Sequence, residues 1–185
     1  MLISFTGAQS TGKSTLLQRM YQSEELRKCS FVKEVTRKVA AQGLNINDAG
    51  DNMTQLFILS EHLHNHHLDG CVVLDRCIID GYIYTKWLHE QNKVEGWVLK
   101  YAWDLHNALV DTLDIIFYPE PGDVQLVDDG ERSTCENFRN DIIKMYDTYL
   151  NHNPKVRNKL IRLSGTVDQR MVQIKQTLNN HDKIR

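Results

Sequence analysis

Residues 7–15, GAQSTGKST, follow directly on the short apolar run LISFT and decide the fold. Their spacing matches the pattern G-x-x-x-x-G-K-[ST] of a phosphate-binding loop at every position, from Gly7 to Ser14. In such a loop the backbone N–H groups surround phosphate oxygens, because glycine accepts the dihedral angles that the turn requires. A complete match between a strand and a helix favours a real phosphate loop over a chance glycine-rich turn.

The loop predicts a nucleoside triphosphate, ATP in the first instance, bound together with Mg²⁺. We expect Lys13 to bridge the β- and γ-phosphates and the Ser14 hydroxyl to ligate the metal ion. Asp75 closes the apolar run CVVLD and is the second expected metal residue, acting through water; a helix N-cap is the alternative role. The loop residues expected to bind the nucleotide are Gly7, Ala8, Gln9, Ser10, Thr11, Gly12, Lys13, Ser14 and Thr15.

Apolar runs alternate with stretches of helical spacing along the whole chain. We expect strands at residues 2–5, 29–35, 71–75, 113–121 (broken by Pro119 and Pro121) and 159–165. Helices are expected at 13–26, 36–43, 53–68, 78–88, 95–109, 135–150 and 166–178. This order predicts an α/β fold of the phosphate-loop NTPase type, with a mostly parallel five-stranded sheet and helices on both faces. We expect one domain over residues 1–185, with a lid segment at about 122–140.

Composition narrows the class of protein further. The 185 residues carry a formal net charge of -2, which argues weakly against a non-specific DNA-binding protein. The cysteines Cys29, Cys71, Cys77 and Cys135 form no C-x-x-C pair, so we expect reduced thiols rather than a zinc site or disulfides. No signal peptide or membrane span is evident, and we expect a cytoplasmic protein without a membrane partner.

Four charged residues outside the loop suggest a phosphate acceptor. Arg76 follows Asp75 at the expected mouth of the sheet, where it suits an anionic or hydroxyl-bearing acceptor; a surface ion pair is the alternative. Glu34 ends the second expected strand and could orient or deprotonate an acceptor hydroxyl, or simply be an exposed strand end. Arg132 and Arg139 share a helical face and could close over the phosphates, or belong to a solvated face.

These features favour a small kinase over a GTPase switch, because no guanine-reading N-K-x-D follows the fourth expected strand, where YPEPGD stands. The acceptor would be a nucleoside, a nucleotide or a nucleic-acid base. The alternative class is a phosphate-loop ATPase or a nucleotide-dependent binding module without a small acceptor. Whether the chain acts as a monomer or a homodimer stays open.

The chain resembles the phosphate-loop nucleoside and nucleotide kinases. Among these kinases, the chain is similar to the ribosylnicotinamide-kinase domain of bifunctional NAD-biosynthesis regulators. The similar segments are ISFTGAQSTGKSTL, EVTRKV, DLHNALVDTLDIIFYPEP, VDDGERSTCENFR and LIRLSGTVDQR. LDR also resembles the D-R step of thymidylate and deoxynucleoside kinases. The resemblance implies that Arg76 contacts the acceptor, that Glu34 or Asp75 serves its hydroxyl, that Arg132 and Arg139 are lid arginines, and that Gly165 lies near the adenine.

Two departures limit this resemblance. We expect no nucleotidyltransferase domain, and Cys77 replaces the tyrosine of a D-R-Y motif, which argues against thymidylate as the acceptor. Short chains of this type are also similar to bacteriophage kinases that phosphorylate 5-hydroxymethyluracil within DNA, which would place the protein in a host cytoplasm. A DNA acceptor would require an exposed base and local basic residues.

Three further features carry weaker expectations. The helix with His62, His64, His66 and His67 is interpreted as a solvated face rather than a metal site. Gln55 could reach an acceptor base or pack beside the core. Trp103 or Tyr101 could stack on an acceptor, although core packing is the more common role of such residues.

Overall fold

The computed structural model describes residues 1–23, 26, 28–122 and 136–182. Five strands form one sheet in the order β2-β3-β1-β4-β5, and every pairing in it is parallel. The strands are β1 (Leu2–Phe5), β2 (Ser30–Val32), β3 (Val72–Asp75), β4 (Ile115–Pro119) and β5 (Leu160–Leu163). The predicted α/β phosphate-loop fold is therefore confirmed.

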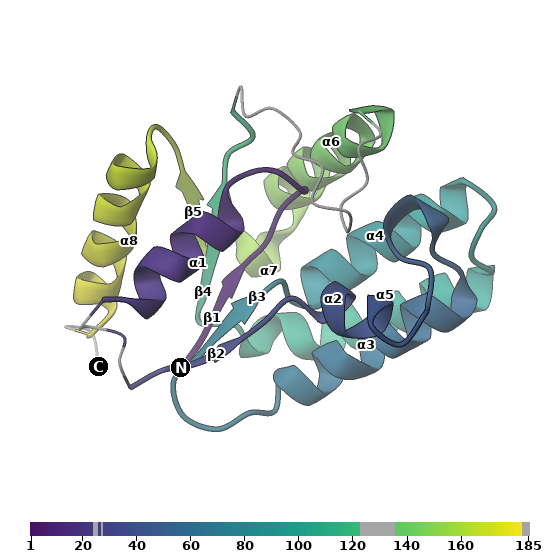
Figure 1. The fold of residues 1–185 in the computed structure, drawn as a ribbon, viewed down its shortest axis with the longest axis horizontal. Helices are drawn as coiled ribbons and strands as arrows, with labels where there is room; N and C mark the ends of the chain where they lie inside the picture. Colours follow the sequence, from purple (N-terminus) through teal and green to yellow (C-terminus); the bar gives the residue numbers. More distant parts are fainter. Residues whose placement is uncertain (24–25, 27, 123–135, 183–185) are drawn as a thin grey trace.

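Helices cover both faces of this sheet (Figure 1). One face carries α1 (Lys13–Tyr21) and α8 (Val167–Asp182), and the opposite face is covered chiefly by α4 (Ile78–Glu90), α5 (Gly96–Leu109) and α6 (Glu136–His152). Further helical segments of the described residues are α2 (Val35–Ala40), η2 (Asn47–Ala49), α3 (Asn52–Asn65), η3 (Val110–Thr112) and α7 (Pro154–Arg157).

Alternation along the strands divides the core into two layers. Ile3 and Phe5 of β1 pack with α1 and α8, whereas Leu2 packs toward α4, α5 and α6. Because both layers are apolar, the central strands read as continuous hydrophobic runs, which is typical of parallel sheets buried on both sides. The carboxyl ends of the strands lie together at one edge, where doubly wound sheets bind their ligands.

Several predicted boundaries are wrong by a few residues. The expected strand 29–35 ends at Val32, and Glu34 is the N-cap of α2 rather than a strand residue. The helix expected to reach about residue 68 ends at Asn65. The short helix α7 was not predicted; Asn153 caps it by accepting from the Lys155 N–H. Arg132 and most of the expected lid lie outside the described residues.

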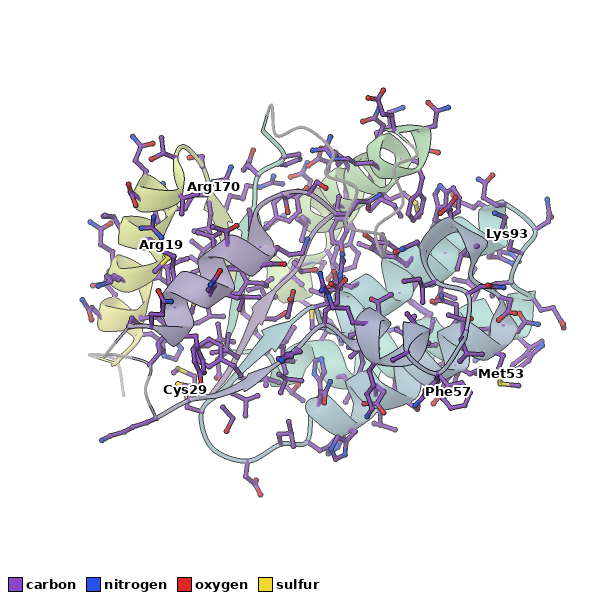
Figure 2. The ribbon with its side chains drawn as sticks, in the orientation of Figure 1. Arg19, Cys29, Met53, Phe57, Lys93 and Arg170 are labelled. Carbon is purple, nitrogen blue, oxygen red and sulfur yellow. A yellow bond between two sulfur atoms is a disulfide. The ribbon has the colours of Figure 1, made fainter. Side chains whose placement is uncertain are left out.

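The prediction of reduced cysteines is wrong for one pair. Cys29 and Cys71 form a disulfide, with their Cα atoms 4.5 Å apart (Figure 2). Parallel pairing of β2 and β3 places Ser30 opposite Val72, so the residues just before each strand become neighbours. A sequence separation of 42 residues hides this proximity. Cys77 is buried as a free thiol, and Cys135 lies outside the described residues.

The prediction of a solvated histidine face is wrong for two of the four residues. His62 and His66 are buried, while His64 and His67 are exposed. His66 accepts at Nε2 from the Ile78 N–H at the start of α4, and its Nδ1 contacts the Thr112 hydroxyl. Burial lowers the pKa of His62 to about 4. Burial and the nearby His62 lower the pKa of His66 to about 3.

Removing the disulfide should destabilise the fold. The cross-link closes a long loop of the unfolded chain, so Cys71→Ala should lower the free energy of unfolding by about 2–4 kcal/mol. Urea unfolding with and without a reductant measures this. In the matched Cys29→Ala/Cys71→Ala variant the reductant should have no effect. Equal stability of the wild type in both conditions would contradict the structural role of the pair.

The buried histidines should make the protein acid-sensitive. Their pKa values in the folded state lie below the ordinary value of 6.5, so the unfolded chain binds more protons as pH falls. The free energy of unfolding should therefore decrease between about pH 6.5 and pH 4, by on the order of 3 kcal/mol for His62 alone. Urea unfolding across this range checks the slope. His66→Gln should flatten it and the exposed-site variant His64→Gln should not; identical slopes would refute this account.

Candidate active site

The phosphate loop joins β1 to α1 through two glycines with left-handed backbone angles. Gly7 has φ 133° and Gly12 has φ 87°, values that favour glycine. At Gly7 a Cβ atom would also lie 3.2 Å from the Tyr118 ring, so a larger residue would displace the loop or that ring. Lys13 is the first residue of α1, and the loop therefore ends at the positive end of a helix dipole.

Lys13 lies beneath this loop and is buried. Its Nζ donates to the Gly7 carbonyl at 2.9 Å and to the Ala8 carbonyl at 2.5 Å. Burial first, and the positive charge of Arg76 second, lower the Lys13 pKa to about 7. A phosphate group beside Nζ would favour its charged form, since an opposite charge stabilises the ammonium ion.

One cavity brings the loop together with three of the predicted acceptor and metal residues. It is lined by Gln9, Ser10, Thr11, Gly12, Lys13, Ser14, Thr15, Glu34, Asp75 and Arg76. The sheet produces this meeting, because Phe5 of β1 is in register with Asp75 of β3, and the loop and the β3–α4 turn then leave the sheet side by side.

The polar atoms of the cavity fit a magnesium–triphosphate group. Buried Ser10 Oγ and Gln9 Nε2 have no protein partner among the described residues, as expected where a polar ligand completes the hydrogen bonding. Ser14 and Asp75 offer the oxygen ligands that Mg²⁺ prefers, and this ion commonly takes few protein ligands besides substrate phosphates. Burial, and then the charge of Glu34, raise the Asp75 pKa to about 6. The described residues contain no group of three His, Cys, Asp or Glu side chains that could hold a metal ion.

Arg76 is held between two carboxylates at the side of this cavity. Its Nε donates to Glu34 Oε1 at 2.5 Å, and its Nη1 donates to Asp80 Oδ1 at 2.9 Å. Nη1 also donates to the Gly7 carbonyl at 3.0 Å, the same oxygen that accepts from Lys13. The side chain is 9% exposed, so its ion pairs are buried rather than the surface contact considered as an alternative.

Arg76 determines the ionisation of Glu34. Burial alone would raise the Glu34 pKa, but the charge and hydrogen bond of Arg76 outweigh it and lower the pKa to about 2. Glu34 is therefore a carboxylate at neutral pH and a weak base. It is better suited to accept a hydrogen bond from a hydroxyl than to remove its proton completely.

The other predicted site residues differ in how they lie relative to the phosphate loop. Arg139 of α6 reaches the loop, where its Nε donates to the Gln9 carbonyl at 3.3 Å, and its buried Nη2 has no protein partner among the described residues. Gly165 follows β5, and its carbonyl accepts from Arg170. Arg132 lies outside the described residues.

Arg170 of α8 (labelled in Figure 2) was not predicted. Its side chain ties three segments around the loop. Its guanidinium donates to the carbonyls of Gly165, Thr11 and Glu120 at 2.9, 2.9 and 3.0 Å. The sequence offered one signal of this role. A basic residue such as Arg170 in the first turn of a helix is unfavourable beside the positive end of the helix dipole, so its position suggests a specific contact. Asp80 was also not predicted, although it lies only five residues after Asp75.

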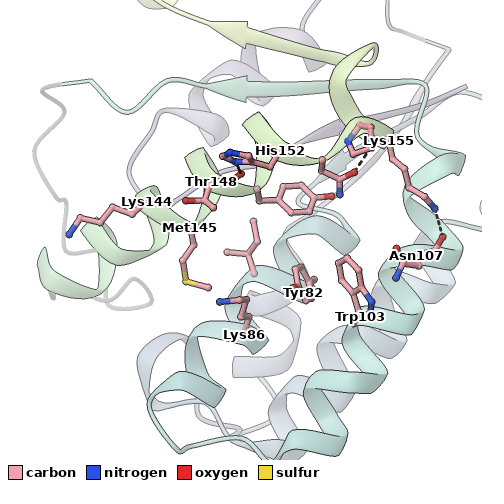
Figure 3. A pocket seen from close by; sticks show the side chains of 13 residues that line it. Tyr82, Lys86, Trp103, Asn107, Lys144, Met145, Thr148, His152 and Lys155 are labelled. Carbon is pink, nitrogen blue, oxygen red and sulfur yellow. Dashed lines mark hydrogen bonds between the residues drawn. The ribbon is translucent and has the colours of Figure 1, made fainter.

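A second concave surface lies between α4, α5 and α6, away from the loop (Figure 3). This groove has a volume of about 560 Å³, and its lining includes Tyr82, Trp103, Met145 and Tyr149. Trp103 is 41% exposed and stacks on His106. The structure places Trp103, which was considered for stacking on an acceptor, in this groove, and the residues lining the phosphate cavity do not include it.

Comparisons with known proteins agree with this architecture. The profile of a family described as AAA domain matches residues 2–170, and the chain belongs to this family. No curated protein matches it by sequence. In the described residues, no helix has both the length and the apolar character needed to cross a membrane.

Solved kinase structures share the fold at low sequence identity. A deoxyadenosine kinase from M. mycoides with bound products aligns with a TM-score of 0.71 and 18% identity, over 97% of this chain and 99% of that one. An NadR protein in complex with NAD and AMP-PNP aligns with a TM-score of 0.71 and 16% identity, over 95% of this chain and 48% of that one. Thymidylate kinase from Candida albicans aligns with a TM-score of 0.66 and 13% identity, over 98% and 92%. The fold is that of phosphate-loop nucleoside and nucleotide kinases.

Replacing Arg170 should loosen the nucleotide loop. Arg170→Lys keeps the charge but loses the planar group that reaches three carbonyls at once. We expect Mg²⁺–ATP affinity to fall by about tenfold, which corresponds to the loss of one hydrogen bond to a charged group. Isothermal titration calorimetry measures this affinity. Arg19→Lys, in an exposed ion pair with Asp168, is the matched control and should bind ATP normally. Wild-type affinity in Arg170→Lys would show that the clamp does not shape the loop.

Proposed function

We propose that this protein is an ATP-dependent kinase that transfers the γ-phosphate to a hydroxyl of a nucleoside, a nucleotide or a nucleic-acid base. The observation that carries the proposal is the pairing of Arg76 with Glu34 at the rim of the phosphate loop, beside Lys13. A hydrolase needs only the loop, a metal ion and a positioned water. A buried arginine–carboxylate pair on the far side of the phosphates suits the binding of a second substrate.

The residues have distinct roles in this proposal. The loop amides, Lys13 and Arg139 bind the phosphates. Ser14 and Asp75 would hold Mg²⁺, which when bound would neutralise charge developing on the phosphate oxygens. Glu34 orients the acceptor hydroxyl. The oxygen of the acceptor hydroxyl forms a bond to the γ-phosphorus while the bond from this phosphorus to the β–γ bridging oxygen breaks. ADP leaves with the electron pair of the broken bond. The hydroxyl proton passes to a nearby carboxylate or to water.

A narrow cavity behind Arg76 is the proposed place for the acceptor base. Its lining includes Gln55, His62, Gly81 and Tyr84. The Thr85 hydroxyl lies 2.9 Å from Gln55 Oε1 and 2.7 Å from the Gly81 carbonyl, so it holds the Gln55 amide beside this cavity. His62 Nδ1 is buried without a protein partner in the described residues, and the lowered pKa keeps the ring neutral. Both side chains offer the hydrogen bonds that a base edge requires.

The structural neighbours support this reading at the level of class. The deoxyadenosine kinase structure holds the products dCMP and dCDP, and another NadR structure is a complex with NR. We also propose a cytoplasmic location; a disulfide such as Cys29–Cys71 is uncommon in that compartment.

Acceptor-dependent turnover tests the proposal. ADP release and transfer of label from γ-labelled ATP should be measured with deoxyadenosine, thymidine, dTMP, nicotinamide riboside and DNA containing 5-hydroxymethyluracil. We expect at least one acceptor to take the label and to accelerate ADP release. ADP release that every acceptor leaves unchanged would instead support the ATPase or binding-module alternative.

Two variants separate the roles of donor and acceptor residues. Lys13→Ala should lower kcat by at least about 100-fold, as loss of a group stabilising transition-state charge does. The exposed-site variant Lys100→Ala is its control. Arg76→Ala should raise the acceptor KM or lower kcat while ATP affinity is largely kept. Normal kinetics in Arg76→Ala would remove Arg76 from the site.

A further inference from the structure

Asp80 of α4 is a buried carboxylate at which four parts of the site meet. Its side chain is 3% exposed. Hydrogen bonds reach it from the end of β1, the phosphate loop, the β3–α4 turn and α6. The donors are Thr6 Oγ1 at 2.7 Å, the Gly7 N–H at 3.5 Å, Arg76 Nη1 at 2.9 Å, the Cys77 N–H at 3.0 Å and the Tyr146 hydroxyl at 2.7 Å.

The two oxygens of Asp80 face different parts of the structure. Oδ2 accepts from Thr6 and from the Cys77 N–H, and the latter bond belongs to the capping box that begins α4. Oδ1 accepts from Arg76, Tyr146 and Gly7. Capping α4 and contacting Thr6 require only one oxygen. The negative charge and the second oxygen are directed at the arginine.

Arg76 needs such support because its backbone is unfavourable. Its φ of 76° lies in the left-handed region, which persists for a residue other than glycine only when the surroundings fix it. Glu34 holds the guanidinium at Nε and Asp80 holds it at Nη1. Tyr84 adds a ring 5.2 Å from the guanidinium carbon.

We propose that Asp80 is a positioning residue for phosphoryl transfer: it anchors Arg76 against the Gly7 carbonyl, so that Arg76 stays beside the phosphates when Glu34 turns to an acceptor hydroxyl. The inference rests on the proposed kinase function. With Glu34 as the only anchor, binding of the acceptor would compete with the ion pair that places Arg76. With a second carboxylate at Nη1, Glu34 can exchange partners without releasing the arginine.

Asp80→Asn tests the proposal sharply. The Asn carbonyl can replace Oδ2 and keep the bonds from Thr6 and Cys77, while its NH₂ group meets the donors Arg76 and Tyr146. The first readout needs no acceptor: it is the ¹⁵Nε–Hε resonance of Arg76, assigned by its loss in Arg76→Ala. We expect this resonance to shift and its hydrogen to exchange faster in Asp80→Asn. The matched exposed-site variant Asp104→Asn should leave it in place.

The second readout is kinetic and uses whichever of the five acceptors named above turns over fastest. Asp80→Asn should lower kcat/KM for that acceptor by at least tenfold and change Mg²⁺–ATP affinity by less than threefold. In an Arg76→Ala background the same substitution should lower kcat/KM by less than twofold, because the side chain that Asp80 positions is absent. Tyr146→Phe, which removes a buried bond to the same oxygen, should lower Tm but keep kcat/KM within threefold.

The outcomes separate this proposal from the proposed function. If no acceptor turns over, the kinase assignment fails, and with it a positioning role in transfer, even if the resonance shows that Asp80 anchors Arg76. The proposal would be overturned if Asp80→Asn left the Arg76 resonance unchanged, or if it lowered kcat/KM as much in the Arg76→Ala background as in the wild type. Acceptor-dependent turnover of the wild type would still uphold the kinase assignment in either case. If Asp80→Asn does not fold, Asp80→Glu moves the charge by one methylene group and must shift the resonance; no shift would refute the anchor.

Discussion

The Gly7 carbonyl oxygen organises the site, because it accepts hydrogen bonds from both Lys13 and Arg76. One cation belongs to the nucleotide loop and the other to the turn after β3, and a single acceptor brings them together. This meeting depends on the parallel pairing of β1 with β3, which aligns Phe5 with Asp75. A register shift of one residue would send these strand side chains to the opposite face and separate the two cations.

Burial gives the charged groups of the site unequal properties. Arg76 is flanked by Glu34 and Asp80, so the carboxylate of Glu34 stays ionised with a pKa of about 2. Within the described residues no such ion pair holds Asp75, and burial raises its pKa to about 6 against the opposing charges of Arg76 and Lys13. Two carboxylates in one cavity are thus suited to different tasks: Glu34 to hydrogen bonding in the ionised state, Asp75 to a metal ion whose charge would favour its ionised form.

Much of the fold could be predicted from local signals. The loop motif, the apolar runs and the helical spacing are encoded in neighbouring residues, and they predicted the fold class and the approximate positions of the strands along the chain. The failures involve pairs that are distant in sequence. The Cys29–Cys71 disulfide, the burial of His62 and His66, and the Arg170 clamp all depend on which elements pack together, and a single sequence does not display that packing.

The most direct test of the central claim is a crystal structure with Mg²⁺, ADP and aluminium fluoride, which mimics the transferring phosphoryl group in the transition state. The account predicts that Lys13 Nζ and an Arg76 Nη atom both lie within about 3 Å of the fluoride atoms, the range of a hydrogen bond. A structure in which Lys13 alone contacts the fluoride and Arg76 remains on its two carboxylates, away from the phosphates, would contradict it.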